Sequence, residues 1–248
     1  MRILVTFAVD AEFAPWRKLR QFQRKASAEM EYSVCQVGGV ELGVLLTGIG
    51  GKKAWTEATR IIWDSDVDVC ISSGLAGGLR PEHRAGEILA AEKVVAAGSV
   101  HFVTCNASLL QCATDCGAKR VRSFYTANRV IVESKEKREL GAIADAVEME
   151  SSEILQEAAA FGARGIAVRA ISDTADEDLP LDFNRLASDS GDVSLLKVFG
   201  EVVASPSSIP ALVRFGRRSQ VAAESLAGFL ERYVSTLAPV LTQAGAAR

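Results

Sequence analysis

The stretch GIAVRAISDTAD, residues 165–176, decides the class of fold. Residues 165–172 form an apolar run with β-branched side chains, which is typical of a strand buried on both faces of a sheet. The runs ILVTFAV (3–9) and VDVCISSG (67–74) have the same character, and helical patterns lie between the runs. Strands that alternate with helices predict a three-layer α/β/α sandwich with a central mixed, largely parallel sheet.

The remaining elements follow from the same periodicities. Gly38 and Gly39 predict a hairpin between strands at 33–37 and 40–48, and LAGGL (75–79) predicts a glycine-rich turn. Further strands are expected at 86–97 (as one strand or two), 129–133 and 145–149. Helices are expected after residue 133 and at 52–64, 150–161, 194–203 and 209–237.

The composition is that of a globular protein, with 48% hydrophobic and 24% charged residues. No repeat or composition break divides the chain, so we expect a single domain over residues 1–248. The net charge of −3 gives no indication of a nucleic-acid partner. The N-terminal residues MRILVTFAVDAEF lack the features of a signal peptide, which leads us to expect a cytoplasmic protein.

The cysteines raise the question of a metal site. The chain has 5 cysteines, and three of them lie with a histidine in HFVTCNASLLQCATDCG (101–117). His101, Cys105, Cys112 and Cys116 could bind zinc, but their spacing lacks a C-x-x-C pair. In a helix the three cysteines would share one face and pack as small hydrophobes. We therefore predict reduced thiols and no metal.

Polar residues follow the apolar strands at several places. They are Asp10 and Glu12, the run 47–50, Ser72-Ser73-Gly74, the run 148–150, and Ser172-Asp173. Each has a simple structural explanation, since glycines mark turns, Asp173 could cap a helix, and Glu148 and Glu150 could be solvated. Because ligands bind at the carboxyl ends of strands in α/β sheets, the carboxylates together predict a catalytic site. A dinucleotide site is not expected, because the G-x-G-x-x-G pattern is absent.

These residues resemble a known superfamily, that of the purine nucleoside phosphorylases and the methylthioadenosine/S-adenosylhomocysteine nucleosidases. VEMESSEILQEAAAFGARGIAVRAISDTAD (147–176) is similar to its signature, FAVDAEF (7–13) to its first loop, and SSGLAGGL (72–79) to its T-G-S-A-G-G-L turn. The resemblance implies the nucleoside phosphorylase-like fold. It also implies cleavage of the N-glycosidic bond of purine nucleosides, by hydrolysis or by phosphorolysis.

The resemblance also implies a role for each site residue. Asp173 matches the acid that protonates the leaving base, with Ser172 beside it, and Glu12 matches the base that activates water. Glu150 matches the carboxylate that accepts hydrogen bonds from the ribose hydroxyls. Arg169 matches an arginine near the nucleophile, where it could hold water or phosphate. The expected substrate-binding residues are Ala76, Gly77, Glu148, Met149, Glu150, Arg169 and Ser172.

The chain departs from the superfamily at several positions. Leu75 stands where the nucleosidases have a serine that helps to hold the nucleophile, and no arginine for phosphate lies near Ser72. Where the nucleosidases place an aromatic against the base, the alignment passes through Lys135-Glu136-Lys137. The hopanoid-associated nucleoside phosphorylases resemble the chain more closely, in K-x-x-L-G-A (137–142) and in the region 205–230. That type implies an adenosine with a large hydrophobic 5′ substituent.

The same resemblance implies no cofactor, although phosphate could be a co-substrate, and it implies a homo-oligomer. Arg214, Arg217 and Arg218 lie on a C-terminal helix with an apolar face, so that helix could dock on a membrane surface or could simply pack on the core. A non-catalytic nucleoside-binding protein on the same fold is the alternative function. Leu75 favours that alternative, and the intact set of Glu12, Glu150 and Asp173 disfavours it.

Overall fold

The computed structural model describes residues 1–27, 30–50, 56, 66–182, 184 and 209–246. The described strands form one 11-stranded sheet in the order β2-β3-β4-β1-β5-β11-β6-β10-β9-β7-β8. They are β1 (Arg2–Phe7), β2 (Gln23–Ser27), β3 (Met30–Val37), β4 (Val40–Leu46), β5 (Val69–Ser72), β6 (Leu75–Gly78), β7 (Ile88–Ala96), β8 (Phe102–Thr104), β9 (Lys119–Thr126), β10 (Ala146–Glu148) and β11 (Arg164–Asp173). The described helices are α1 (Asp10–Leu19), α3 (Ala107–Asp115), α4 (Ser134–Leu140), α5 (Ser151–Ala160) and α8 (Ile209–Ala246).

The centre of the sheet is parallel, as the apolar runs predicted. β5 pairs in parallel with β1 on one side and with β11 on the other. Val5, Ile71 and Ile166, one from each strand, are fully buried. Antiparallel pairs, such as β3 with β4 and β7 with β11, make the sheet mixed. The carboxyl ends of β1, β5 and β11 therefore point the same way, and the polar residues that follow them meet there.

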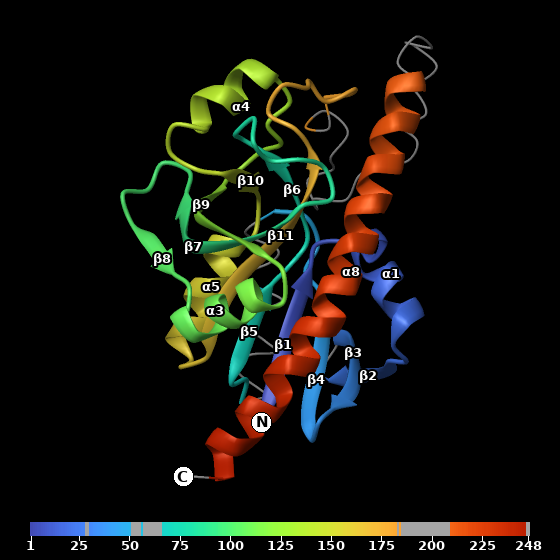
Figure 1. The fold of residues 1–248 in the computed structure, drawn as a ribbon, viewed down its shortest axis with the longest axis vertical. Coiled ribbons are helices and arrows are strands. Elements are labelled where there is room, and N and C mark those ends of the chain that lie inside the picture. The colour runs from blue at the N-terminus through green and yellow to red at the C-terminus, as the bar shows by residue number, and fades with distance from the viewer. Residues whose placement is uncertain (28–29, 51–55, 57–65, 183, 185–208, 247–248) are drawn as a thin grey trace.

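Helices cover both faces of the sheet, which confirms the predicted layers. α8 runs along one face beside α1 and α3, and α5 lies on the opposite face (Figure 1). The alternation of side chains along β1 serves both layers. Val5 belongs to the core beneath α8, whereas its neighbour Leu4 packs in a smaller cluster with Ile154 and Ala158 of α5.

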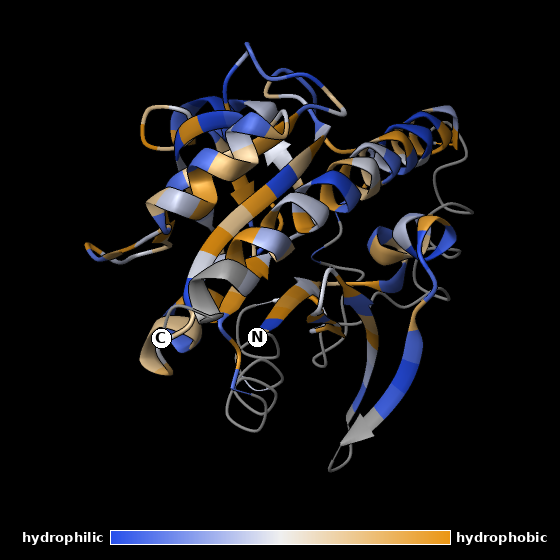
Figure 2. Ribbon diagram, turned by 60° about the horizontal axis from the view of Figure 1, so that its bottom comes forward, coloured by the Kyte–Doolittle hydropathy of each residue, from blue (hydrophilic) through white to orange (hydrophobic). Residues whose placement is uncertain are grey.

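α8 is amphipathic along its length, with apolar and polar residues on different sides (Figure 2). Its buried side includes Leu226, Phe229 and Tyr233, and the Tyr233 hydroxyl donates to the Leu109 carbonyl at 2.9 Å. Within the described residues, none of the helices combines the length and the hydropathy needed to cross a membrane. The predicted helix at 209–237 is confirmed and continues to Ala246.

Several sequence expectations were wrong or incomplete. Residues 75–79 do not form only a turn, because β6 pairs there with β11 and β10. Residues 129–133 are not a strand. Their backbone bonds instead to the chain near residue 180, with Val130 N–H donating to Asn184 Oδ1 and Leu179 N–H to the Val132 carbonyl. The sequence analysis also missed β9, whose lysine and arginines masked its period. The predicted helices at 52–64 and 194–203 lie outside the described residues, apart from residue 56.

Gly141 ends α4 at a very close approach to another segment. A Cβ atom at this position would lie 2.4 Å from the Leu79 carbonyl oxygen, which is backbone and cannot turn away. We expect Gly141→Ala to lower the free energy of unfolding by about 1–3 kcal/mol. Gly228 within α8 is the matched control, because a Cβ there would meet only Arg232 Nη1 at 3.7 Å. Gly228→Ala should raise the free energy by roughly 0.5–1 kcal/mol. Urea unfolding measures both, and equal stability of the two variants would contradict this account.

Candidate active site

Glu12 lies in the first turn of α1, directly after β1. Its carboxylate accepts hydrogen bonds from the backbone N–H groups of Ala8 at 2.9 Å and Val9 at 3.3 Å, and from that of Leu75 at 2.9 Å. Burial raises the pKa of Glu12 above its usual value, while these hydrogen bonds and the charge of Arg169 act in the opposite direction. The buried carboxylate is thus held by backbone donors at the junction of β1 and β6.

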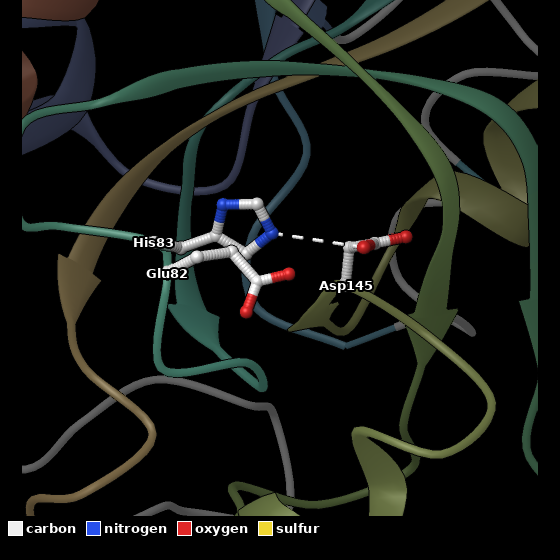
Figure 3. Close-up of side chains that lie close together, drawn as sticks. All are labelled: Glu82, His83 and Asp145. Atoms are coloured by element: carbon white, nitrogen blue, oxygen red, sulfur yellow. Dashed lines mark ion pairs between the residues drawn. The ribbon is translucent and has the colours of Figure 1, made fainter.

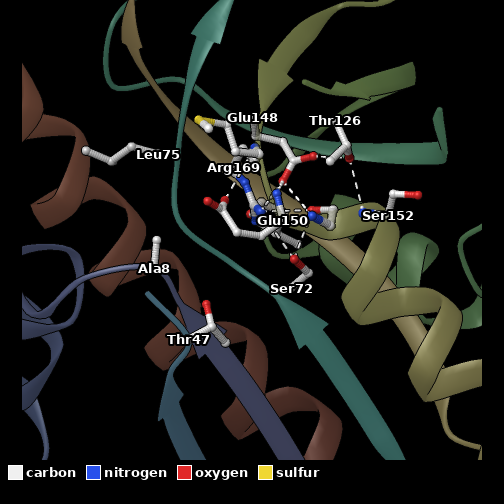
Figure 4. Close-up of polar contacts among 12 residues, drawn as sticks. Ala8, Thr47, Ser72, Leu75, Thr126, Glu148, Glu150, Ser152 and Arg169 are labelled. Atoms are coloured by element: carbon white, nitrogen blue, oxygen red, sulfur yellow. Dashed lines mark hydrogen bonds and ion pairs between the residues drawn. The ribbon is translucent and has the colours of Figure 1, made fainter. Parts of the chain in front are cut away.

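Arg169 of β11 and Glu148 of β10 form a buried ion pair, with Nη2 and Oε2 2.6 Å apart. The same Nη2 donates to the hydroxyls of Ser72 at 3.2 Å and Ser151 at 2.8 Å. Figure 4 shows this cluster with Thr126, whose hydroxyl donates to Glu148. Glu148 is therefore neither solvated nor at an edge, and its negative charge is balanced by the Arg169 guanidinium.

Glu150 lies beside this pair at the start of α5. Its Oε1 accepts from the Gly50 N–H at 2.9 Å and its Oε2 from the Met149 N–H at 3.3 Å. Burial, followed by the nearby charge of Glu148, raises the pKa of Glu150 to about 8, although Arg169 and the Gly50 hydrogen bond oppose the shift. Glu150 is therefore a buried carboxyl group whose pKa lies well above that of an exposed glutamate.

Asp173 ends β11 and is also buried. Its Oδ1 accepts from the Ser172 hydroxyl at 2.6 Å, and its Oδ2 lies 2.5 Å from Nζ of Lys137. A Cβ atom on Gly77 would come within 3.1 Å of Oδ2, so glycine at this position leaves room for the carboxylate. Asp173 is thus not merely a helix cap, because it pairs with a buried ammonium.

Lys137 was not among the site residues expected from the sequence. It lies in the Lys- and Glu-rich segment of α4, where no apolar period distinguishes a buried lysine from an exposed one. The sequence pointed to it only through the K-x-x-L-G-A run and through its alignment with the segment where the nucleosidases place an aromatic residue. No aromatic residue takes that place in the described part of α4.

β6 brings the two groups of carboxylates together. The Leu75 N–H binds Glu12, and Gly77, two residues along the same strand, packs against Asp173. The Ala76 carbonyl between them accepts from the Ser172 hydroxyl at 3.2 Å. Met149 is half-buried beside Glu150. The structure therefore places the expected site residues around β6 and the carboxyl ends of β1, β10 and β11.

A cavity of about 250 Å³ opens beside Asp173. The loop that follows β11 and the first turns of α8 form its walls. The lining residues are Asp173, Glu177, Asp178, Leu179, Pro180, Ala211, Arg214, Phe215 and Arg218. The Arg218 guanidinium donates to the Glu177 carboxylate. Phe215 is an aromatic lining residue that the sequence analysis did not assign.

The described residues include one cluster of possible metal ligands (Figure 3), formed by Glu82, His83 and Asp145. Their ligand atoms lie within 4.8 Å of one another. Two side-chain nitrogens already lie beside Asp145, because Arg80 Nε is 3.2 Å and His83 Nε2 3.6 Å from its Oδ1. Asp145 Oδ2 also accepts from the Ser123 N–H at 3.1 Å. These contacts form a polar network that ties the loop after β6 to β9 and to the start of β10.

The cysteine-rich stretch lies around α3, away from these carboxylates. Burial raises the pKa of Cys105 and of Cys112 to about 11 in each case. Burial thus favours the neutral thiol form of both side chains. Cys105 is buried in the main core and Cys112 packs against it, which fits the prediction of small hydrophobic side chains.

The family of the chain follows from a comparison with family models. Residues 2–199 match the model described as the phosphorylase superfamily. The chain belongs to this superfamily.

Solved structures with the same fold include nucleosidases. A futalosine hydrolase mutant of Helicobacter pylori superposes with a TM-score of 0.74 at 19% identity, covering 95% of this chain and 99% of that chain. The methylthioadenosine/S-adenosylhomocysteine nucleosidase of the same organism, bound to butyl-thio-DADMe-Immucillin-A, gives 0.74 at 20% identity with coverage of 95% and 98%. That of Campylobacter jejuni gives 0.71 at 20%, with coverage of 95% and 99%. These similarities establish the fold.

The raised pKa of Glu150 makes stability depend on pH. The folded protein keeps this proton up to about pH 8, whereas the unfolded chain releases it near its ordinary value of 4.5. The stabilisation is therefore full below the ordinary pKa and is lost as the pH rises through the folded value. We expect Glu150→Gln to reduce the fall in the free energy of unfolding between about pH 5 and about pH 9, as measured by urea unfolding. Glu139→Gln at an exposed position of α4 is the control. An unchanged pH dependence in Glu150→Gln would contradict the raised pKa.

Proposed function

We propose that this member of the phosphorylase superfamily cleaves the N-glycosidic bond of purine nucleosides of the adenosine type. The observation that carries the proposal is the meeting of Glu12 and Asp173 at β6, with Glu150 near enough to Glu12 for their charges to interact, beside a cavity that Asp173 lines. Cleavage of such a bond develops positive charge on the sugar and negative charge on the base. Carboxylates can stabilise the first, and an acid can neutralise the second.

Each carboxyl group has surroundings that suit one task. Asp173 lies at the cavity and would donate a proton to the leaving base. Glu12 would take the proton of the attacking water, since its raised pKa makes it a better base than an exposed glutamate. Glu150 would accept hydrogen bonds from the ribose hydroxyls, with Met149 against the sugar. Ala76 and Gly77 would line the floor between Glu12 and Asp173.

Water is the nucleophile that the surroundings of Arg169 favour. A phosphate site needs cationic donors that are not already neutralised. Arg169 Nη2 is engaged by Glu148, Ser72 and Ser151, and Nη1 donates to the Val168 carbonyl at 3.1 Å. Since Glu148 balances the charge of Arg169, we propose hydrolysis as the reaction and phosphorolysis as the alternative that a phosphate requirement would reveal.

The cavity would hold the purine base and the hydrophobic 5′ substituent of the nucleoside. Leu179, Pro180 and Phe215 offer apolar contacts, and the opening continues along the first turns of α8. This arrangement supports a nucleoside with a hydrophobic 5′ substituent as substrate. A non-catalytic nucleoside-binding protein is the second candidate, and Leu75, whose side chain cannot hold water as serine would, is the observation that favours it.

Replacement of the acid tests the proposal. Wild-type protein should release adenine from methylthioadenosine, adenosylhomocysteine or an adenosine with a longer 5′ alkyl group, without phosphate. Asp173→Asn keeps the size of the side chain but cannot donate a proton as an acid, so we expect a loss of roughly 10²–10⁴-fold in kcat. Asp176→Asn, on the same loop but exposed and paired with Arg138, should retain activity. Adenine release is followed by chromatography. Full activity of Asp173→Asn would rule out its role as the acid.

We also propose that the enzyme is a cytoplasmic homo-oligomer and that it needs no cofactor. We propose in addition that the start of α8 binds to membrane surfaces. Ile209 and Val213 are 44% and 50% exposed there, and Arg214 and Arg217 are exposed beside them. An apolar and basic surface of this kind binds anionic lipid.

We expect the protein to sediment with vesicles of anionic phospholipid at low salt and not with zwitterionic vesicles. The double variant Val213→Glu/Arg217→Glu should lose this binding. Val240→Glu, at an exposed position near the other end of α8, should retain it. Absence of wild-type binding to anionic vesicles would rule out the membrane contact.

A further inference from the structure

Lys137 is the buried cation closest to the candidate acid. Its side chain has no exposed surface, and its Nζ lies 2.5 Å from Asp173 Oδ2. Nζ also donates to the carbonyls of Glu177 at 2.8 Å and Thr174 at 3.3 Å. An ammonium has three protons to donate, and these contacts use all of them. The ammonium is therefore fixed in place and has no donor left for a substrate atom.

The backbone around Lys137 is built to hold it there. Gly141 lets the end of α4 approach the Leu79 carbonyl closely, which sets the position of the helix. The loop after β11 turns its carbonyls at 174 and 177 toward the ammonium. Because a buried lysine without a partner is costly, this set of contacts ties the cation to Asp173 and to its loop.

Other charged groups near Asp173 are farther along the cavity or are already paired. Glu177 and Asp178 come from the same loop, and Arg214 and Arg218 come from α8. Arg218 binds Glu177, and Asp178 accepts from the Ser134 N–H at 2.7 Å. Within the described residues, Lys137 is the cation in contact with the Asp173 carboxylate.

We propose that Lys137 is a positioning residue that sets the charge of Asp173 during base release, an inference that rests on the proposed function. As the bond between the sugar and the base breaks, its electron pair goes to the base, and the Asp173 proton moves to a base nitrogen. Water forms the new bond to the sugar carbon and gives its proton to Glu12. Asp173 is left as a carboxylate, whose charge the Lys137 ammonium balances, and Lys137 itself neither gains nor loses a proton.

The same ion pair has a cost for the resting enzyme. The ammonium contacts the charged carboxylate directly, so loss of that contact should change how the activity depends on pH. The contact that balances the charge of Asp173 after proton transfer thus opposes the return of a proton to it. This trade-off distinguishes a role in catalysis from a role in folding alone, because it predicts a shift in a pH profile.

The experiment compares Lys137→Met with wild type and with Lys135→Met, an exposed lysine of the same helix. In Lys137→Met the falling limb of kcat/KM should move to higher pH by about one unit or more. Activity on the low-pH plateau should fall by about tenfold or more, because no ammonium balances the charge left on Asp173 when it gives up its proton. Lys135→Met should match wild type in both respects. An unmoved limb in an active Lys137→Met variant overturns the proposal.

A spectroscopic measurement makes the inference independent of turnover. The infrared difference spectrum between wild type and Asp173→Asn near neutral pH should show the bands of a carboxylate. The difference between Lys137→Met and Lys137→Met/Asp173→Asn should instead show the carbonyl band of a protonated acid. If Lys137→Met alone does not fold, the double variant should still fold, because it removes both charges. Its stability is then compared with that of Asp173→Asn, which should be less stable because it leaves the Lys137 ammonium buried without its partner.

The two proposals can fail separately. If wild type releases no adenine but the infrared bands change as described, the proposed function is wrong and the control of the Asp173 charge by Lys137 stands. If adenine is released but the same carboxylate bands persist without Lys137, the inference is wrong and the function stands. Equal or greater stability of Asp173→Asn relative to the double variant also contradicts the ion pair.

Discussion

The buried pair of Arg169 and Glu148 is the interaction on which the site depends. It joins β11 to β10 and, through Ser72 and Ser151, adds β5 and the start of α5. Removing two charges from water is costly, and the loss is offset only when the remaining donors and acceptors are satisfied. Glu148 meets this condition with the N–H groups of residues 150 and 151 and the hydroxyl of Thr126. Loss of either partner would leave a charge without compensation in the middle of the sheet.

The consequences of this pair reach the neighbouring carboxyl groups. The charge of Arg169 lowers the pKa of both Glu12 and Glu150, while that of Glu148 raises the pKa of Glu150. Burial raises both values and dominates. Burial around one ion pair thus gives both glutamates a higher proton affinity than exposed glutamates have.

β6 sets the positions of Glu12 and Asp173 relative to the backbone. Its strand lies between β11 and β10, so that one backbone N–H reaches Glu12 while Gly77 gives way to Asp173. Gly74 just before it adopts φ +146, and a Cβ atom there would lie 3.0 Å from Glu12 Oε1. Glycine at these two positions is therefore required by the close approach of carboxylates to backbone. The LAGGL run therefore contains a strand that contacts the carboxylates of Glu12 and Asp173, and it is not only a turn.

The sequence by itself determined the central strands, the α/β layers, the long C-terminal helix and the residues that meet at the carboxyl ends of β1, β5 and β11. Apolar runs and helical periods depend on local burial, and they can be counted along the chain. Tertiary structure alone decided that residues 75–78 pair as a strand, that 129–133 bond to a loop, and that Lys137 contacts Asp173. Those outcomes depend on distant partners, and Asp173 is 36 residues from Lys137. A lysine in a charged helix carries no local pattern that distinguishes a buried ammonium from a solvated one. The decisive quantity is the environment that the folded chain creates around a group, and that environment exists only after distant segments have come together.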